Sequence, residues 1–494
     1  MNFAEYEGLM FSSAYIGGQW VTAETNDKFK VENPFNGNAL NSVPNMRGED
    51  ARKAIKAAEE ALPAWQSRLA ADRAKLLMNW HDLILEYRNA LSQLMVLEQG
   101  KPYAEARGEI SYGASFIKWF AEEAIRDHGA LIPSFAKGRR LLVIKQAVGV
   151  VAAITPWNFP HAMITRKCAP ALAAGCTVVV KPAEDTPLSA LALAHLAEKA
   201  GIPPGVFNVI TCDREGAQEV GEVLCTDPRV RKVGFTGSTT VGKHVMTLAS
   251  STVKRVSLEL GGNAPFIVFD DAQLPLAIKG LFASKFRNAG QTCICANRIF
   301  VQRAILEDFT AQLVSRVKYL ILGSGESTKT EIGPLINLRA IRRAQDLVKG
   351  ALNEGANLLC GGRTLNQHLD EDDNGVFFEP TILTDIKSDM TIAHSELFAP
   401  IVTIIPFDHE EEVLQMANDT PFGLAAYFFT ESHRRIWRVS EGLEYGMVAV
   451  NDGVLSSAVA PFGGVKESGI GREGSSWGLD EFTELKYVML GGLD

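Results

Sequence analysis

The chain has no long apolar run, since no stretch reaches the roughly 18 consecutive residues that a membrane-spanning helix needs. It also has no block of one charge. With 49 Lys and Arg against 58 Asp and Glu, the net charge is 49 − 58 = −9. A nucleic-acid-binding surface needs a basic face for the phosphate backbone. Residues 1–7 are acidic and lack the features of a secretory signal or a transit peptide. We therefore expect no membrane or nucleic acid as partner, and a cytoplasmic location, with the mitochondrial matrix as the alternative if a transit peptide has been removed.

Cysteines are few and scattered, with seven in 494 residues. An odd number without regular spacing is not typical of a disulfide scaffold and favours a reducing compartment. Cys293 and Cys295 are too close together for the usual Cys-x₂₋₄-Cys zinc pair, and no second pair accompanies them. We expect no metal site.

The length allows two or three domains. Hydrophobic spacing predicts alternating strands and helices, which indicates an α/β fold with a parallel sheet. The expected strands are 140–146, 148–154, 176–182, 206–210 and 231–237, and the expected helices are 49–66, 70–97, 103–128, 163–173, 187–200 and 214–225. A second α/β series begins with a strand at 265–269 and helices at 273–288 and 304–319, residues 361–376 read as an exposed loop, and 483–490 read as a terminal strand.

The most informative motif is Gly290-Gln291-Thr292-Cys293, which places a cysteine in a turn directly after a predicted helix. About thirty residues upstream, Glu259 is followed by Gly261 and Gly262. A thiol that attacks carbonyl carbon needs a nearby base, and glycines leave the approach open. Taken alone, Cys293 could equally be a small buried cysteine, as most cysteines are.

Two further motifs indicate a nucleotide cofactor. The segment Gly237-Ser238-x₃-Gly242 follows a predicted strand and opens a helix, where backbone N–H groups favour a pyrophosphate. Its spacing differs from the standard Gly-x-Gly-x-x-Gly, so a tight turn is an equal reading of this segment by itself. Lys181 and Glu184 stand at the C-terminal end of a buried strand, at the edge where open α/β sheets bind ligands.

In combination, these segments resemble the aldehyde dehydrogenase superfamily, and the resemblance runs from residues 15–20 to the C-terminal strand. It implies a Rossmann-type parallel-sheet cofactor domain at 1–128 and 149–264, an α/β catalytic domain at 265–455, and an oligomerisation arm at 129–148 and 456–494. It also implies a homo-oligomer, either a dimer or a tetramer.

The resemblance assigns chemical roles to three residues. Cys293 would be the nucleophile that forms a thiohemiacetal and then a thioester, and Glu259 the general base. Asn158, in Pro156-Trp157-Asn158-Phe159-Pro160, would stabilise the oxyanion. From the residues alone, Asn158 could instead be a turn residue between prolines.

The same resemblance places a nicotinamide cofactor on Thr155, Trp157, Lys181, Glu184, Gly237, Ser238, Gly242, Glu396 and Phe398. Glu184 could accept hydrogen bonds from both ribose hydroxyls and would repel a 2′-phosphate, which favours NAD over NADP. Alanine at 399 replaces the glycine of the family's Glu-x-Phe-Gly-Pro motif and makes the assignment of Glu396 and Phe398 less secure.

Within the superfamily, the runs 162–167, 256–271, 285–288 and 484–487 resemble the succinate-semialdehyde dehydrogenase branch. This implies oxidation of succinate semialdehyde to succinate in 4-aminobutanoate degradation. Arg166, Arg287 and Ser456 would then bind the substrate's distal carboxylate, a task that suits the planar guanidinium group. Glutarate semialdehyde would satisfy the same residues, and a broader aldehyde specificity is a further alternative.

Two readings from other classes compete with this one. A cofactor-free thiol hydrolase would use Cys293 and Glu259 but leaves Lys181 and Glu184 unexplained. A non-catalytic protein on the same fold has no need for the nucleophile, the base and Asn158 together. The pair Cys293 and Cys295 adds a redox hypothesis, in which a strained and easily reduced disulfide switches the enzyme off.

Overall fold

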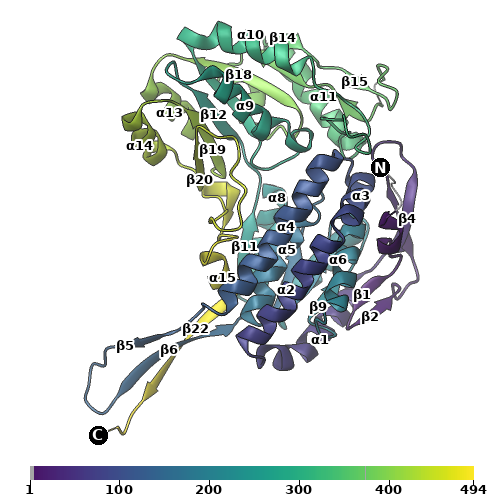
Figure 1. Cartoon of the computed structure of the whole chain (residues 1–494), viewed down its shortest axis with the longest axis vertical. Helices are drawn as coiled ribbons and strands as arrows, with labels where there is room; N and C mark the ends of the chain where they lie inside the picture. The colour runs from purple at the N-terminus through teal and green to yellow at the C-terminus, as the bar shows by residue number, and fades with distance from the viewer. Residues whose placement is uncertain (1–4, 373, 494) are drawn as a thin grey trace.

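The computed structural model describes residues 5–372 and 374–493. Two large sheets, each packed against helices, make up the body, and a narrow three-stranded sheet projects from it (Figure 1). The mixture of mainly parallel sheets and helices confirms the predicted α/β class. Among the described residues, no helix is long and apolar enough to cross a membrane.

The first sheet has eight strands, and its five central strands are parallel. The edge strands β1, β2 and β21 pair antiparallel. In spatial order the strands are β2 (Gln19–Val21), β1 (Ala14–Ile16), β9 (Phe207–Val209), β8 (Thr177–Lys181), β7 (Val150–Ile154), β10 (Val230–Thr236), β11 (Arg255–Glu259) and β21 (Gly469–Ile470).

Both faces of this sheet are buried, because successive side chains of a strand point to opposite faces. On β7, Val151 and Ala153 belong to one apolar core, and Val150, Ala152 and Ile154 to another. The first core includes residues of α2 (Ala70–Glu86), α3 (Arg88–Gln99), α4 (Tyr103–Ala124), α5 (Ala162–Ala174) and α6 (Pro187–Lys199). The second includes residues of α1 (Gly48–Gln66), α7 (Gly216–Thr226) and α8 (Thr239–Ser250). A hairpin of β3 (Lys28–Glu32) and β4 (Ala39–Pro44) lies near the N-terminus.

The second sheet has seven strands, all parallel except the edge strand β14. Its order is β14 (Asn357–Cys360), β17 (Thr381–Thr384), β18 (Ile401–Phe407), β13 (Ala296–Gln302), β12 (Ala264–Val268), β19 (Ala425–Phe429) and β20 (Met447–Val450). The accompanying helices are α9 (Leu274–Lys285), α10 (Leu306–Val317), α11 (Leu338–Asn353), α12 (Thr391–His394), α13 (Glu410–Asn418) and α14 (His433–Gly442). One continuous apolar core joins this sheet to its helices.

The projecting sheet consists of β5 (Ala130–Ile132), β6 (Arg140–Ala147) and β22 (Thr483–Leu490), in the order β22-β6-β5. β6 and β22 pair antiparallel along their whole length, from Ala147 opposite Thr483 to Arg140 opposite Leu490. It extends away from both main sheets at the lower left of Figure 1. Leu131 and Leu485 are 70% and 71% exposed in the single chain. These two apolar side chains therefore gain no burial from the fold of one subunit.

Some expected elements have different bounds in the structure. The expected helix 70–97 is two helices that meet at Tyr87, and α9 ends at Lys285 rather than near 288, because Asn288 and Ala289 are left-handed. Residues 361–376 contain β15 (Thr364–Leu365), which pairs with β16 (Phe377–Phe378); residue 373 of that segment lies outside the described residues.

The C-terminal segment divides between two sheets. β21 belongs to the eight-stranded sheet, and α15 (Trp477–Asp480) packs against α5. From Thr483 the chain forms β22 of the projecting sheet. The three-domain division stays a proposal, and the structure limits the C-terminal strand of the arm to 483–490.

Candidate active site

The Cys293 loop is formed by an abrupt reversal of the chain between α9 and β13. Asn288, Ala289 and Gly290 have φ angles of 51°, 53° and 76°, in the left-handed region that normally favours glycine. The backbone N–H of Asn288 donates to Glu105 Oε2 at 2.7 Å, which holds this strained turn. Gly290 is required here, because a Cβ would stand 2.3 Å from the carbonyl oxygen of Ala399.

Glu259 is the last residue of β11 and is buried beside this loop. Gly262, three residues after Glu259, packs closely against the backbone of Cys293. A Cβ at position 262 would stand 2.4 Å from the carbonyl oxygen of Cys293, so only glycine allows this approach. Glu259 Oε2 is buried and has no hydrogen-bond partner among the described residues. The structure therefore brings the predicted nucleophile and the predicted base together.

Both groups hold their protons more tightly than free side chains do. Burial raises the pKa of Cys293 to about 12, while Arg166 opposes the shift. Burial, with repulsion from Glu473, raises the pKa of Glu259 well above the usual carboxyl range. Deprotonation of both groups therefore becomes easier as pH rises.

Asn158 lies between the cysteine loop and α5, and its backbone carbonyl is firmly held. Lys101 Nζ donates to this carbonyl at 2.8 Å and to Glu109 Oε2 at 2.5 Å. Asn288 Nδ2 donates to the same carbonyl at 3.0 Å. The side-chain amide of Asn158 donates to the carbonyl of Gln291 at 3.1 Å. Because an amide carries two N–H donors, one remains available for a substrate oxygen.

A cavity of about 730 Å³ lies at the carboxyl ends of β7, β8 and β10. It is lined by seven of the nine residues predicted to bind the cofactor: Thr155, Trp157, Lys181, Glu184, Gly237, Ser238 and Phe398. Thr155 Oγ1 is buried and has no hydrogen-bond partner among the described residues, so it is free to bind a polar ligand group. The N-terminus of α8 opens at this cavity, where Ser238 caps it by accepting from the N–H of Val241. The residues present therefore fit a dinucleotide.

The other two predicted cofactor residues, Gly242 and Glu396, are not among those that line the cavity. A Cβ at Gly242 would stand 2.3 Å from the Leu260 side chain, so this glycine lets α8 pack close to the end of β11. Glu396 Oε1 accepts from the N–H of Gly262 at 3.1 Å, and burial raises its pKa to about 7. Phe398 has a φ of 51° and its ring meets the Trp157 ring edge-on at 5.6 Å.

Arg287 and Ser456 lie together, as the sequence predicted. Arg287 donates to Ser456 Oγ at 3.3 Å, and its guanidinium lies 4.7 Å from the centre of the Phe159 ring. Among the described residues, no carboxylate lies within ion-pair distance of Arg287. This arginine is six residues upstream of Cys293 and on the same loop.

Arg166 is also in the site, but it is fully buried and forms an ion pair with Glu473. Its guanidinium lies 4.0 Å from the centre of the Phe462 ring. Burial alone would raise the pKa of Glu473, but Arg166 and Lys167 lower it to about 2. Arg166 therefore has a carboxylate partner before any substrate enters, and it shares that partner with Lys167.

Sequence reasoning missed Lys101, Glu109 and Glu473. Lys101 lies between the expected helices 70–97 and 103–128, and it contacts Asn158 across 57 positions. Because these contacts are non-local, no spacing within a motif could have revealed them. The only available signal was the position of Lys101 between two apolar helices. A lysine that is buried there needs a partner, because Lys and Glu side chains are rarely buried unpaired.

Cys295 is buried two positions beyond Cys293, and its thiol lies 3.3 Å from Lys285 Nζ. The redox switch remains a prediction. We expect peroxide to inactivate the enzyme and dithiothreitol to restore it, with Cys295→Ala losing the reversible part. The measurement is residual activity with and without the reductant, beside a Cys360→Ala control. Equal rescue of parent and Cys295→Ala would exclude the switch.

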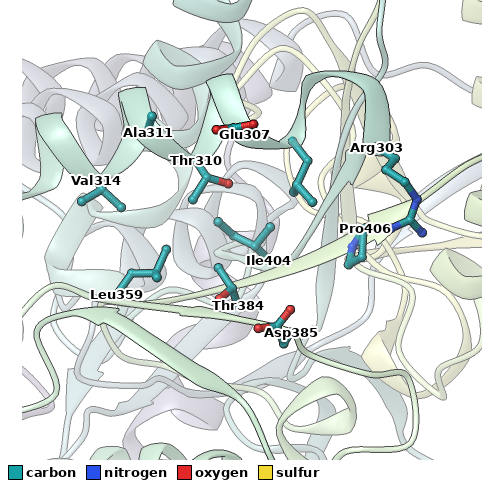
Figure 2. A pocket seen from close by; sticks show the side chains of 11 residues that line it. Arg303, Glu307, Thr310, Ala311, Val314, Leu359, Thr384, Asp385, Ile404 and Pro406 are labelled. Carbon is teal, nitrogen blue, oxygen red and sulfur yellow. The ribbon is translucent and has the colours of Figure 1, made fainter.

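A separate hollow of about 620 Å³ lies between α10 and strands β17 and β18 (Figure 2). Its wall is mostly apolar, with Val314, Leu359, Ile404 and Pro406 among the side chains shown. None of the predicted site residues lines it. We therefore place the active site at the Cys293 loop and not in this hollow.

Comparison with known proteins agrees with this geometry. Residues 20–488 match the family described as "Aldehyde dehydrogenase family". The succinate-semialdehyde dehydrogenase [NADP(+)] GabD of Escherichia coli is 51% identical over 98% of each chain, as is a 3-sulfolactaldehyde dehydrogenase of Pseudomonas putida. A glutarate-semialdehyde dehydrogenase of Pseudomonas aeruginosa is 50% identical over 98% of this chain and 99% of its own.

A solved structure shows the same fold. An aldehyde dehydrogenase from Brucella melitensis superposes with a TM-score of 0.95 at 51% identity, covering 98% of each chain. The family model and these relatives span nearly the whole sequence, and the nucleophile, the base and the cofactor cavity occur together in the structure. The chain belongs to the aldehyde dehydrogenase family.

Proposed function

We propose that the protein oxidises succinate semialdehyde to succinate with NAD. The observation that carries this proposal is the position of Arg287, which forms no ion pair among the described residues, is hydrogen-bonded to Ser456 and lies on the same loop as the nucleophile. A substrate that joins an aldehyde to a distal anion complements this arrangement.

The residues of the site perform distinct steps. The thiolate of Cys293 adds to the aldehyde carbon after Glu259 has taken the thiol proton, and the amide proton of Asn158 that is not donated to Gln291 stabilises the oxygen that becomes negative. A nicotinamide held in the cavity would supply the hydride acceptor that oxidation of this adduct to a thioester requires. Glu259 removes a proton from water so that the water can hydrolyse the thioester and release the acid. The Lys101–Glu109 pair fixes the carbonyl of Asn158 and thereby orients that residue.

The proposal for NAD depends on Glu184. Its carboxylate lines the cofactor cavity beside Lys181, where it could accept both ribose hydroxyls and repel a 2′-phosphate. Arg214 and Arg339 line the same cavity, so positive charge for a 2′-phosphate is nearby. NADP, which the name of the Escherichia coli relative specifies, is therefore the alternative.

Glu184→Ser should shift the preference from NAD towards NADP. Two lost ribose hydrogen bonds should lower kcat/KM for NAD by about tenfold to a hundredfold. Loss of the negative charge should raise kcat/KM for NADP. The measurement is initial rate against each cofactor at saturating aldehyde, with Glu184→Gln as a size-matched control that removes only the charge. A wild type that already prefers NADP would refute the proposal for NAD.

Three named activities among the relatives have one chemical feature in common. Succinate semialdehyde, glutarate semialdehyde and 3-sulfolactaldehyde each carry an aldehyde and a distal anionic group. The anion-binding residues suit all three, so glutarate semialdehyde and a broader aldehyde specificity remain the alternatives. Four runs, at 162–167, 256–271, 285–288 and 484–487, resemble the succinate-semialdehyde dehydrogenase branch. This resemblance supports succinate semialdehyde as the main proposal.

Arg287→Ala should lower kcat/KM for succinate semialdehyde by about a hundredfold, since it leaves the distal carboxylate without its charged partner. The rate with butanal, which has no carboxylate, should change little. Arg303→Ala is a matched control, because Arg303 pairs with Asp408 on the exposed surface. Equal loss with both aldehydes would mean that Arg287 supports the loop and does not select the substrate.

We also propose that the projecting sheet joins copies of the chain into a dimer or a tetramer. Its exposed Leu131, Leu485 and Tyr487 would be covered by such contact. For location, the scattered cysteines support the cytoplasm, with the mitochondrial matrix as the alternative.

A further inference from the structure

Tyr112 is a polar side chain in the substrate region that the proposed mechanism does not use. It lies on α4, and its ring meets the Phe116 ring edge-on at 5.0 Å. The same ring packs against the small apolar cluster of Phe159, Ala162 and Met163. The ring is partly exposed, but its hydroxyl is buried and has no hydrogen-bond partner of normal geometry among the described residues.

The hydroxyl of Tyr112 faces the residues that we assign to the substrate's anion. Ser456 lies beside it, and Arg166, Arg287 and the carboxylate of Glu473 act on it electrostatically. Arg287 in turn contacts both Ser456 and the Phe159 ring. Tyr112, Ser456 and Arg287 therefore converge from α4, the 456 segment and the cysteine loop on one region.

Of the two arginines in this region, only Arg287 forms no ion pair among the described residues. Arg166 is fully buried and paired with Glu473, which also pairs with Lys167. A carboxylate has two oxygens with about four acceptor positions, more than one arginine fills. Ser456 accepts from Arg287 and keeps its own proton for donation, which leaves room for one more donor.

We propose that Tyr112 is a specificity-determining residue that donates its phenolic hydrogen to the distal anion of the substrate, together with Arg287 and Ser456. The inference rests on the proposed function and deepens it. It moves the third contact from Arg166, which is ion-paired with Glu473, to the Tyr112 hydroxyl, which is buried without a hydrogen-bond partner among the described residues.

A buried hydroxyl without a partner destabilises the substrate-free enzyme, and an anion that accepts from it removes this penalty. An uncharged aldehyde leaves the hydroxyl unpaired and gains nothing from it. Such a site discriminates against substrates that lack the acceptor. Burial also raises the pKa of Tyr112, so the phenol stays protonated and remains a donor throughout the neutral range.

The test is Tyr112→Phe, which removes only the hydroxyl. We expect KM for succinate semialdehyde to rise about tenfold or more, as for one lost hydrogen bond to a charged group. KM for butanal and kcat with both aldehydes should stay near the wild-type values. Inhibition by succinate, which carries the same carboxylate, should weaken by a similar factor. The thermal midpoint of the substrate-free variant should be equal to or above that of the wild type.

Tyr103→Phe is the matched control, because Tyr103 begins the same helix and its hydroxyl donates to Asn89 Oδ1 at 3.3 Å. It should leave both KM values unchanged. If Tyr112→Phe leaves KM for succinate semialdehyde unchanged while Arg287→Ala still separates the two aldehydes, Tyr112 is only a wall residue and the proposed function stands. If neither variant separates them, both proposals are wrong.

Discussion

Cys293→Ala is expected to abolish aldehyde oxidation, with kcat/KM falling about ten-thousandfold or more, as for loss of a covalent nucleophile. No other thiol can take its place: Cys295 is the nearest in sequence, and its buried sulfur is engaged by Lys285. The measurement is NADH formation with succinate semialdehyde under saturating NAD. Binding of NAD should survive, because Cys293 is not among the residues that line the cofactor cavity.

Cofactor binding can be followed independently through the fluorescence of Trp157, which lines that cavity. Cys360→Ala is the control, since Cys360 ends the edge strand β14, outside the site. Substantial oxidation by Cys293→Ala, with NAD binding intact, would contradict covalent catalysis at this residue.

Glu259→Gln is expected to lower steady-state turnover by about a hundredfold to ten-thousandfold, the usual contribution of a positioned general base. Glutamine keeps the size and the burial but cannot take a proton from water. If Cys293 still reacts, one equivalent of NADH per active site should appear rapidly, and slow thioester hydrolysis should follow. The measurement is stopped-flow NADH absorbance together with the mass of the trapped acyl-enzyme.

The pH dependence provides a second readout for Glu259. Burial and Glu473 raise its pKa, so the active carboxylate form increases as pH rises. Wild-type turnover should therefore increase with pH above the ordinary carboxyl range, and this dependence should disappear in Glu259→Gln. Glu467→Gln is the control, because Glu467 pairs with Lys243 on the surface. An unchanged pH profile in Glu259→Gln would assign the rate-limiting proton transfer to another group.

Local sequence patterns predicted the parts of the fold whose causes are local. The β-branched run at 177–181 predicted a strand buried on both faces, and β8 is fully buried. The motifs around Cys293 and Glu259 include glycines that the structure requires, since a Cβ at Gly262 or Gly290 would meet backbone carbonyls. The glycines that allow this close packing belong to the motifs themselves, so the sequence alone could indicate where the site lies.

The remaining features depend on residues that are far apart in the chain. The pairing of Arg166 with Glu473, and of Lys101 with Asn158, is decided by how α5, α4 and the C-terminal segment pack. The expected helix at 273–288 is shorter because tertiary contacts hold Asn288 in a left-handed conformation that its local sequence does not require. Tyr112 gave no sequence signal, because a tyrosine on an amphipathic helix is ordinarily a packing residue.

The measurement that tests the central claim most directly is the substrate preference of the wild-type enzyme. Initial rates of NADH formation with succinate semialdehyde, glutarate semialdehyde and butanal give kcat/KM for each aldehyde. An anion site beside a covalent thiol predicts a strong preference for succinate semialdehyde over butanal, with glutarate semialdehyde between them. Equal kcat/KM for butanal and succinate semialdehyde would contradict it, and would leave an aldehyde dehydrogenase that does not recognise a distal carboxylate.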